Sequence, residues 1–501
     1  MAGSFKIPDN LIARTIEKFW SSFVMLMTVV SWSAGSGNYW RFSWRAANYG
    51  GGSFLLTYLI WLAIVALPMC IAEYSIGKIG RGGPIHGPYN FSERNKKLAA
   101  FGGMWMAWCD FMIMCYYWVV NGWIFYYLLH SIIGTFWTPG FNSMIFWQSF
   151  GETPLALGIG SAMMALSIVV NAFGIKGIGQ VCRFMFPILF MLTLGLAIFT
   201  TTLPGAIKGL EFYMVPRIEA LLDPATWMQS LSQVLWSVGI AWGFMICAGA
   251  WMRRNDDLTF ASFGNIVNDT AVAWLAGTAI IPLIFAISAN PYEDIKAAGT
   301  GLAFVTLPQL LRHMSWPLGQ VYAVVFFLAF WFAAFTSLIT IHEITMRPLK
   351  DFGLKTHLAA VITGVLAIVV GAPTALSHTW LDYYDTVWGV VGLSIGLVFI
   401  GLIVGFWSNP ARIREKVMDM DIKPFIKLGK WWDILVRANI VIPMIFFSWW
   451  IVYWEWIKGW GEGAYTYYTF PGFLMLAIGA VMLWFFVSKA IEKELKVTGR
   501  S

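Results

Sequence analysis

Long apolar runs dominate the chain, and short polar segments separate them. Each run is about 20 residues long, the length of helix that crosses about 30 Å of hydrocarbon. The pattern predicts twelve transmembrane helices in a single membrane domain over residues 1–501 of an all-α protein. The runs are centred near Val30, Ile60, Tyr117, Ala165, Phe190, Val238, Gly277, Phe327, Gly364, Gly392, Met444 and Ala480.

Two of the predicted spans contain polar and glycine-rich interruptions. The first reads Ser33-Ala34-Gly35-Ser36-Gly37-Asn38, and the sixth reads Ser237-Val238-Gly239-Ile240-Ala241-Trp242-Gly243. Unwound backbone at membrane depth is tolerated only where it lines a cavity or holds an ion, because lipid offers it no hydrogen bonds. Small residues also allow close helix packing, which explains either interruption taken alone. Their occurrence in both spans favours broken helices one and six around a binding site.

Composition and charge agree with a membrane location. The chain is 58% hydrophobic and 12% charged, whereas soluble domains are about 25% charged. Most of the 33 basic residues lie in the tails and in every second loop. By the positive-inside rule we expect both termini in the cytoplasm. The apolar composition predicts a multi-pass protein of the plasma membrane, and we expect no nucleic-acid partner. The opposite loops hold only Lys208, Arg217, Lys296, Arg312 and Lys458.

The sequence does not indicate an enzyme. The five cysteines form no CxxC pair, and the six histidines show no metal-ligand spacing. An enzyme would need acid, base or metal groups that converge within the membrane. The pair His342-Glu343, on the inner half of the eighth span, can be a proton relay or simply a polar pair that faces the cytoplasm.

The strongest motifs surround the first interruption. They are Gly35-Ser36-Gly37-Asn38-Tyr39-Trp40-Arg41-Phe42 and Ala46-Ala47-Asn48-Tyr49-Gly50-Gly51-Gly52-Ser53-Phe54. In these residues, and over spans one to ten, the chain resembles the neurotransmitter:sodium symporter family, which has the bacterial leucine-transporter fold. The resemblance implies inverted five-helix repeats over about 19–205 and about 227–408, with extra helices over about 430–490. The chain departs from the family pattern at Ser43, Arg45, Asn121 and Trp236.

The resemblance implies two sodium sites made of oxygen ligands, which a hard cation prefers. The first would use the side chains of Asn38, Ser237 and Asn268, the Ser33 carbonyl and the substrate carboxylate. The second would use the hydroxyls of Thr336 and Ser337 with the carbonyls of Ser31, Ala34 and Ala333. From the residues alone, these hydroxyls could equally bond within their own helix, and Asn268 could bond between helices.

The resemblance also implies a neutral and apolar amino acid as the small-molecule substrate. Its carboxylate would lie against free amides near Gly35 and Gly37, where carriers of amines place an aspartate. The expected substrate-binding residues lack a fixed charge. They are Ser33, Gly35, Gly37, Ile113, Tyr117, Trp236, Gly239, Trp242, Ser337 and Ile341.

Charged residues are expected to form gates on the outer and inner sides of the binding site. Arg41 and Asp385 match the family's outer pair, and Asp351 matches its inner acid, with Arg14 or Lys18 as the partner. For Asp351 a solvated loop charge is the alternative.

Several properties stay open at this stage. Tyr58, Gln233 and Ser237 match chloride ligands, but Val272 stands at the fourth position, so the use of chloride is undecided. We expect a sodium-dependent symporter that works by alternating access. A proton-coupled carrier, or a sodium-linked sensor or channel of the same fold, is the alternative. The sequence indicates no oligomeric state.

Overall fold

The computed structural model describes residues 22–253, 256–296, 301–420, 424–452 and 466–497. Arg14 and Lys18, the expected partners of Asp351, lie outside these ranges, as does Lys458. In the described part, nine helical segments are long and apolar enough to cross a membrane. They are Gly52–Gly80, Lys96–Ile132, Pro154–Ala172, Gly174–Thr201, Leu258–Ile287, Leu318–Asp351, Thr356–Leu376, His378–Gly405 and Leu474–Glu492.

These segments correspond to the following elements. Gly52–Gly80 comprises α4 (Gly52–Trp61), the π-helical turn η2 (Leu62–Ala66) and α5 (Leu67–Gly80). His378–Gly405 comprises α20 (His378–Tyr384), the π-helical η5 (Asp385–Gly392) and α21 (Leu393–Gly405). The others are α7 (Lys96–Ile132), α9 (Pro154–Ala172), α10 (Gly174–Thr201), α15 (Leu258–Ile287), α18 (Leu318–Asp351), α19 (Thr356–Leu376) and α24 (Thr466–Val497).

The first and sixth spans are broken, as predicted. The first consists of α1 (Ser22–Ser33), α2 (Ser36–Tyr39) and α3 (Arg41–Asn48), and the sixth of α13 (Pro224–Val238) and α14 (Phe244–Trp251). Between α13 and α14, Gly239, Ala241 and Gly243 have φ values of 77°, 68° and 82°. This left-handed backbone cannot continue a helix, and two of the three positions are glycine, which adopts it without steric cost. With α23 (Lys430–Val452), the chain has the twelve expected spans.

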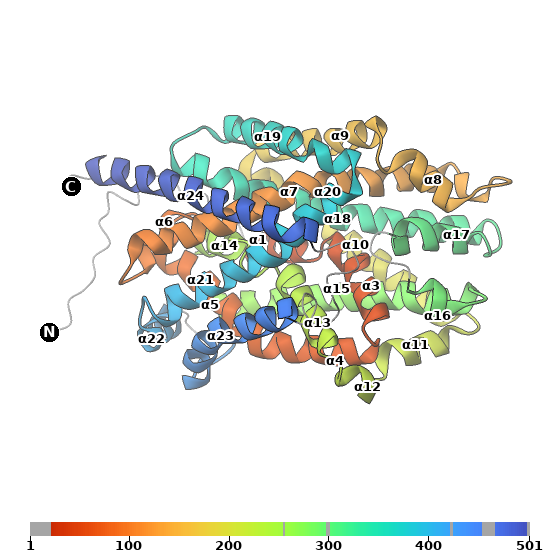
Figure 1. Cartoon of the computed structure of the whole chain (residues 1–501), viewed down its shortest axis with the longest axis horizontal. Helices are drawn as coiled ribbons and strands as arrows, with labels where there is room; N and C mark the ends of the chain where they lie inside the picture. Colours follow the sequence, from red (N-terminus) through yellow and green to blue (C-terminus); the bar gives the residue numbers. More distant parts are fainter. Residues whose placement is uncertain (1–21, 254–255, 297–300, 421–423, 453–465, 498–501) are drawn as a thin grey trace.

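Short helices mark the two ends of the bundle (Figure 1). We call the end that holds α8 (Ser143–Phe150), α11 (Ala206–Met214), α16 (Pro291–Asp294) and α17 (Leu307–Leu311) the outer end. We call the opposite end, with α6 (His86–Phe91) and α22 (Pro410–Met420), the inner end. The short α12 (Ile218–Leu221) precedes α13.

Burial separates central helices from peripheral ones. In α7 and α18 the most apolar windows are 78% and 72% buried, whereas those of α9 and α10 are 33% buried. A peripheral helix in a membrane protein exposes apolar side chains to lipid rather than to water. The broken spans lie in the middle of the bundle, where α1 packs against α10, α15 and α18.

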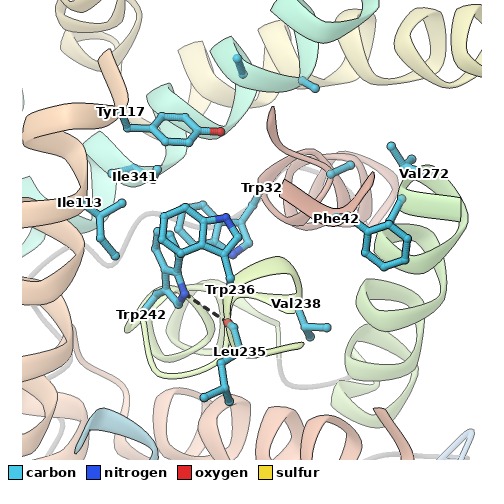
Figure 2. Close-up of a cluster of buried hydrophobic side chains, with 14 of the residues drawn as sticks. Trp32, Phe42, Ile113, Tyr117, Leu235, Trp236, Val238, Trp242, Val272 and Ile341 are labelled. Atoms are coloured by element: carbon cyan, nitrogen blue, oxygen red, sulfur yellow. Dashed lines mark hydrogen bonds between the residues drawn. The ribbon is translucent and has the colours of Figure 1, made fainter. Parts of the chain in front are cut away.

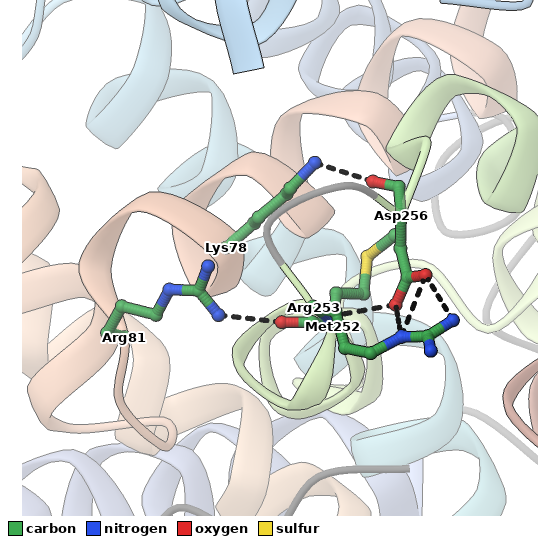
Figure 3. A network of polar contacts seen from close by, with 5 residues as sticks. All are labelled: Lys78, Arg81, Met252, Arg253 and Asp256. Atoms are coloured by element: carbon green, nitrogen blue, oxygen red, sulfur yellow. Dashed lines mark hydrogen bonds and ion pairs between the residues drawn. The ribbon is translucent and has the colours of Figure 1, made fainter. Parts of the chain in front are cut away.

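At the inner end, a polar network ties α5 to the segment between α14 and α15 (Figure 3). The buried Lys78 donates to the Asp256 carbonyl at 2.6 Å, and Arg81 donates to the Met252 carbonyl at 2.7 Å. The Asp256 carboxylate accepts from the backbone N–H of Arg253 at 2.8 Å and from its guanidinium at 3.0 Å. The network therefore holds the inner half of the broken sixth span to α5.

Replacing Asp256 with alanine should lower the free energy of unfolding by about 1–3 kcal/mol, because it removes the acceptor of a backbone N–H and of a charged group. Thermal unfolding of the purified protein measures this. The matched control is Glu293→Ala, which removes the exposed pair with Lys296 and should leave the melting temperature unchanged. Equal melting temperatures for both variants would contradict a stabilising role for the network.

Candidate functional site

A cavity lies where the two broken spans meet α7 and α18. Ser33, Gly35, Gly37, Tyr117, Trp236, Trp242, Ser337 and Ile341 line it, as expected, together with Trp32, Asn38 and Ser237. Of the other expected substrate-binding residues, Ile113 lies beside Tyr117, Ile341 and Trp242 (Figure 2). Gly239 lies behind Trp32, because a Cβ there would be 2.3 Å from the Trp32 indole nitrogen.

Tyr117 connects α7 to the break in the first span. Its hydroxyl accepts from the Ser36 backbone N–H at 3.1 Å and from the Ser36 hydroxyl at 2.9 Å. A Cβ at Gly35 would lie 2.6 Å from the Ser337 Oγ and 3.0 Å from the Tyr117 hydroxyl. A larger residue at this position would therefore have to displace the hydroxyls of Ser337 and Tyr117.

Three tryptophans fill most of the cavity (Figure 2). The Trp242 ring meets Trp32 edge to face at 5.2 Å and Trp236 at 5.1 Å, and Trp32 stacks on Phe244 at 4.6 Å. The remaining cavity is about 20 Å³, roughly the space of one water molecule. A substrate larger than a water molecule therefore requires residues that line the cavity to move.

Trp32 is the residue of this wall that the sequence interpretation missed. Its indole nitrogen is buried and has no hydrogen-bond partner among the described residues. Such a donor in a ligand cavity is available to a bound molecule. The only signal in the sequence is its place directly before the first interruption, and in a chain with 29 tryptophans that signal is weak.

A buried carboxylate forms the centre of the first expected sodium site. Asp269 on α15 accepts from the Ser237 hydroxyl at 2.8 Å and from the Asn38 side-chain amide at 2.7 Å. It also accepts from the Tyr58 hydroxyl at 3.1 Å. The Oδ1 atom of Asn38 is buried and lacks a partner among the described residues. An oxygen without a donor next to a carboxylate fits a small hard cation.

Asn268 is not part of this cluster. Its amide donates to the Gly264 carbonyl of its own helix at 2.7 Å, and its side chain is only partly buried. The expectation that Asn268 joins Asn38 and Ser237 does not hold in the structure. Successive residues point about 100° apart around a helix, so Asn268 points away from the cluster when Asp269 faces it. The neighbouring Asp269 takes that place. Because Asn268 and Asp269 are adjacent in the sequence, only the helix register shows which of them faces Asn38 and Ser237.

The residues of the second expected sodium site come together between α1 and α18. The Thr336 hydroxyl donates within its own helix to the Phe332 carbonyl at 2.8 Å, as the alternative interpretation expected, and its Oγ1 also lies 3.3 Å from the Ser31 carbonyl and 3.2 Å from that of Ala333. The Ser337 hydroxyl lies 3.5 Å from the Ser31 carbonyl and 2.9 Å from the Trp32 carbonyl. Ala34 is buried at the end of α1. Hydroxyl and carbonyl oxygens from two helices thus face one another, as a hard cation requires.

A second buried carboxylate supports the break in the sixth span. Glu73 on α5 accepts from the backbone N–H groups of Ala241 at 2.9 Å and Gly243 at 3.1 Å. Helix unwinding leaves such groups without intrahelical partners, and lipid cannot supply them. Glu73 therefore supplies hydrogen-bond acceptors for the free N–H groups of the unwound segment.

Toward the outer end, the expected charged pair closes over the tryptophans. Arg41 Nη2 lies 3.8 Å from Asp385 Oδ2, and its guanidinium carbon lies 4.5 Å above the centre of the Trp236 ring. Tyr116 donates to Asp385 at 2.8 Å. Arg45 donates instead to the Gln229 carbonyl at 2.9 Å.

At the inner end, Asp351 is not a solvated loop charge. It is held by Arg347, whose Nε lies 3.1 Å from Oδ1, and by His86 at 3.5 Å. Its side chain is 10% exposed. The sequence interpretation did not consider Arg347, although it is one helical turn away on the same helix.

The residues that match chloride ligands bond to other side chains of the protein. Tyr58 and Ser237 both donate to Asp269, and Gln233 accepts from Arg41 at 3.3 Å. Val272 is buried and apolar. The hydroxyls that would bind an anion are therefore directed at a carboxylate.

His342 does not face the cavity or its inner side. Its Nδ1 lies 3.0 Å from the Ser167 hydroxyl, and its Nε2 lies 3.0 Å from the Ala360 carbonyl. Glu343 pairs with Lys350 at 2.8 Å. His342 thus contacts α9 and α19, whereas Glu343 pairs within α18, which does not favour a relay between them. In the described part of the chain, no group of three His, Cys, Asp or Glu side chains could hold a metal ion.

Comparisons with known proteins agree with this arrangement. The family model described as the Sodium:neurotransmitter symporter family matches residues 17–149 and 135–492. An uncharacterized sodium-dependent transporter of Methanocaldococcus jannaschii is 28% identical over 86% of this chain and 88% of its own length. A sodium- and chloride-dependent betaine transporter of Caenorhabditis elegans is 25% identical over 79% of this chain and 75% of its own. The crystal structure of MhsT in complex with L-phenylalanine is 27% identical, with a TM-score of 0.77, and covers 86% of this chain and 99% of MhsT.

Proposed function

Since the chain belongs to the sodium:neurotransmitter symporter family, we propose that it is a sodium-coupled symporter that imports a neutral, apolar amino acid. Members of the family are transporters with multiple membrane helices, not enzymes. The observation that carries the proposal is the Asp269 cluster, where Asn38 presents an unpartnered oxygen beside a buried carboxylate. Sodium is cargo in this cycle, bound with the substrate and released with it.

The substrate class follows from the cavity wall. Tyr117 can donate its hydroxyl proton to a carboxylate, since the bonds it makes to Ser36 use it as acceptor. Position 35 is glycine, so it supplies no acid that would pair with a lone amine. The side-chain end of the cavity is formed by Trp32, Trp236, Trp242 and Ile341, which favour an apolar group. The likeness to the L-phenylalanine complex of MhsT supports an amino acid.

Neutral amino acids such as alanine, leucine or phenylalanine should raise the melting temperature in sodium, whereas tyramine should not. A ligand that binds only the folded state adds RT ln(1 + [L]/Kd) to stability, about 2.7 kcal/mol at 100 times Kd. The measurement is thermal unfolding of the purified protein in sodium and, as the control, in potassium. Stabilisation by the amine alone would reverse the substrate assignment.

We further propose that transport does not require chloride. The Asp269 carboxylate accepts the two hydroxyls, from Tyr58 and Ser237, that a chloride ion would otherwise use. A fixed negative charge next to the sodium ligands supplies the same electrostatic balance as a bound anion.

A further inference from the structure

Asp110 is a buried acid that the proposed transport site does not use. It lies on α7, and its side chain is fully buried. Neither carboxyl oxygen has a hydrogen-bond partner among the described residues. It stands apart from Glu73 and Asp269, which both accept several hydrogen bonds.

The helix register places Asp110 on the inner side of the substrate cavity. Residues three and seven positions apart share one face of a helix, so Asp110 is on the same face as Ile113 and Tyr117. Seven residues along α7 correspond to about 10 Å toward the inner end. Next to it on this face, Met106 approaches Gly243 and Met114 contacts Thr345 at 3.7 Å. Asp110 therefore lies between the cavity and the inner end, beside α14 and α18.

The charged residues nearer the inner end are already paired. Glu343 pairs with Lys350, and Asp351 pairs with Arg347 and His86. Cys247 on α14 is close enough to Asp110, Glu343, Arg347 and Asp351 to sense their charges. The titratable groups that interact with Asp110 are Cys109 and Cys247, and Cys247 also interacts with Glu343, Arg347 and Asp351. Lys350 and His86 are the partners of Glu343 and Asp351, and Glu73 accepts from Gly243, which Met106 approaches.

An ionised carboxylate with no partner is very costly in a dry interior, whereas a protonated carboxyl group loses only its hydrogen bonds, about 1–3 kcal/mol. In the structure, where it is fully buried and unpartnered among the described residues, Asp110 thus carries a proton. When water enters from the inner end, the O–H bond breaks, the proton passes to water and the carboxylate becomes hydrated. Closure reverses this step.

We propose that Asp110 is a proton-binding site that releases and regains one proton on the inner side as the inner half opens and closes. The proposal rests on the alternating access of the proposed function. Because the proton leaves to and returns from the same side, Asp110 adds no net proton transport. Instead, an alkaline inner side favours the open state, because the open state binds fewer protons.

Infrared spectroscopy of the purified protein tests the proton directly and requires no transport. At about pH 7, the difference spectrum between wild type and Asp110→Asn should contain the band of a protonated carboxyl group. The control is Cys109→Ser, one residue away, whose own spectrum should retain the carboxyl band. If Asp110→Asn does not fold, Asp110→Leu gives the same comparison with an apolar side chain. A difference spectrum without this band, or with that of a carboxylate, overturns the proposal.

Alkylation of Cys247 tests the link to opening. In a protein whose other four cysteines are replaced by alanine, the ratio of wild-type to Asp110→Asn alkylation rates removes the titration of the thiol except for the effect of the Asp110 charge on it. An ionised Asp110 disfavours the thiolate and so lowers this ratio at alkaline pH, which is opposite to the rise expected from opening. Between about pH 6 and about pH 8 this ratio should rise at least about threefold. Asp110→Glu should retain the pH dependence. A constant ratio overturns the coupling, and it leaves the sodium-symport proposal untouched, because neither measurement needs sodium or substrate.

Discussion

Replacing Asp269 with alanine should abolish sodium-driven amino-acid uptake, whereas Asn268→Ala should leave most of it. Asp269 is the acceptor shared by Asn38, Ser237 and Tyr58, and its removal leaves three buried donors without their partner as well as a cation site without its charge. Asn268 bonds only to its own helix. We expect a loss of at least about 100-fold in uptake for Asp269→Ala, which corresponds to about 2.7 kcal/mol.

The measurement is the initial rate of labelled amino-acid uptake into proteoliposomes as a function of external sodium. Asn38→Ala and Ser237→Ala, which remove neutral ligands, should raise the sodium concentration needed for half-maximal uptake. Replacement of sodium by potassium should stop uptake by the wild type. Full uptake in potassium would reject the symporter, and an equal loss in the two adjacent variants would reject the ligand role of Asp269.

The second large effect concerns the outer pair. Arg41→Ala and Asp385→Ala should each reduce uptake at least about tenfold. The free-energy loss of the double variant should be clearly smaller than the sum of the two single losses. The pair lies under partial cover, with Arg41 6% and Asp385 29% exposed, so it is stronger than an exposed surface pair. Removing one member leaves the other charge uncompensated. The coupling energy should be about 1–2 kcal/mol.

A double-mutant cycle on initial uptake rates at fixed sodium gives this coupling. Arg45 lies one helical turn beyond Arg41 and can replace it as a partner of Asp385, so Arg41→Ala should be the milder single change. Adding Arg45→Ala to Arg41→Ala should remove this difference. Strict additivity of Arg41→Ala and Asp385→Ala would show that the two residues do not act together.

The sequence predicted the fold and the two breaks because both depend on local patterns. Apolar runs predict spans, and glycines with polar neighbours predict the breaks near Gly35 and Gly239, which the structure contains. The candidate residues on these breaks, such as Asn38 and Ser237, do line one cavity.

What the sequence did not predict depends on helix register and on contacts across the bundle. Asn268 and Asp269 differ by about 100° around α15, and a span with no amphipathic stripe gives no register. Glu73 contacts the unwound segment from another span, a pairing that no local motif encodes. Of the partners of Asp351, His86 comes from another segment, whereas Arg347 is four residues earlier on the same helix and could have been found from its spacing.

In the proposed transport cycle the anion beside the bound sodium is Asp269, a part of the polypeptide, and this decides which charges cross the membrane. A dissolved chloride ion could travel inward and cancel the charge of a sodium ion, but Asp269 stays with α15. We infer that sodium enters without a compensating anion, so that each turnover moves positive charge inward. An inside-negative voltage then contributes about 2.3 kcal/mol per charge for every 100 mV. The cell could thus use its membrane potential, in addition to its sodium gradient, to concentrate the amino acid.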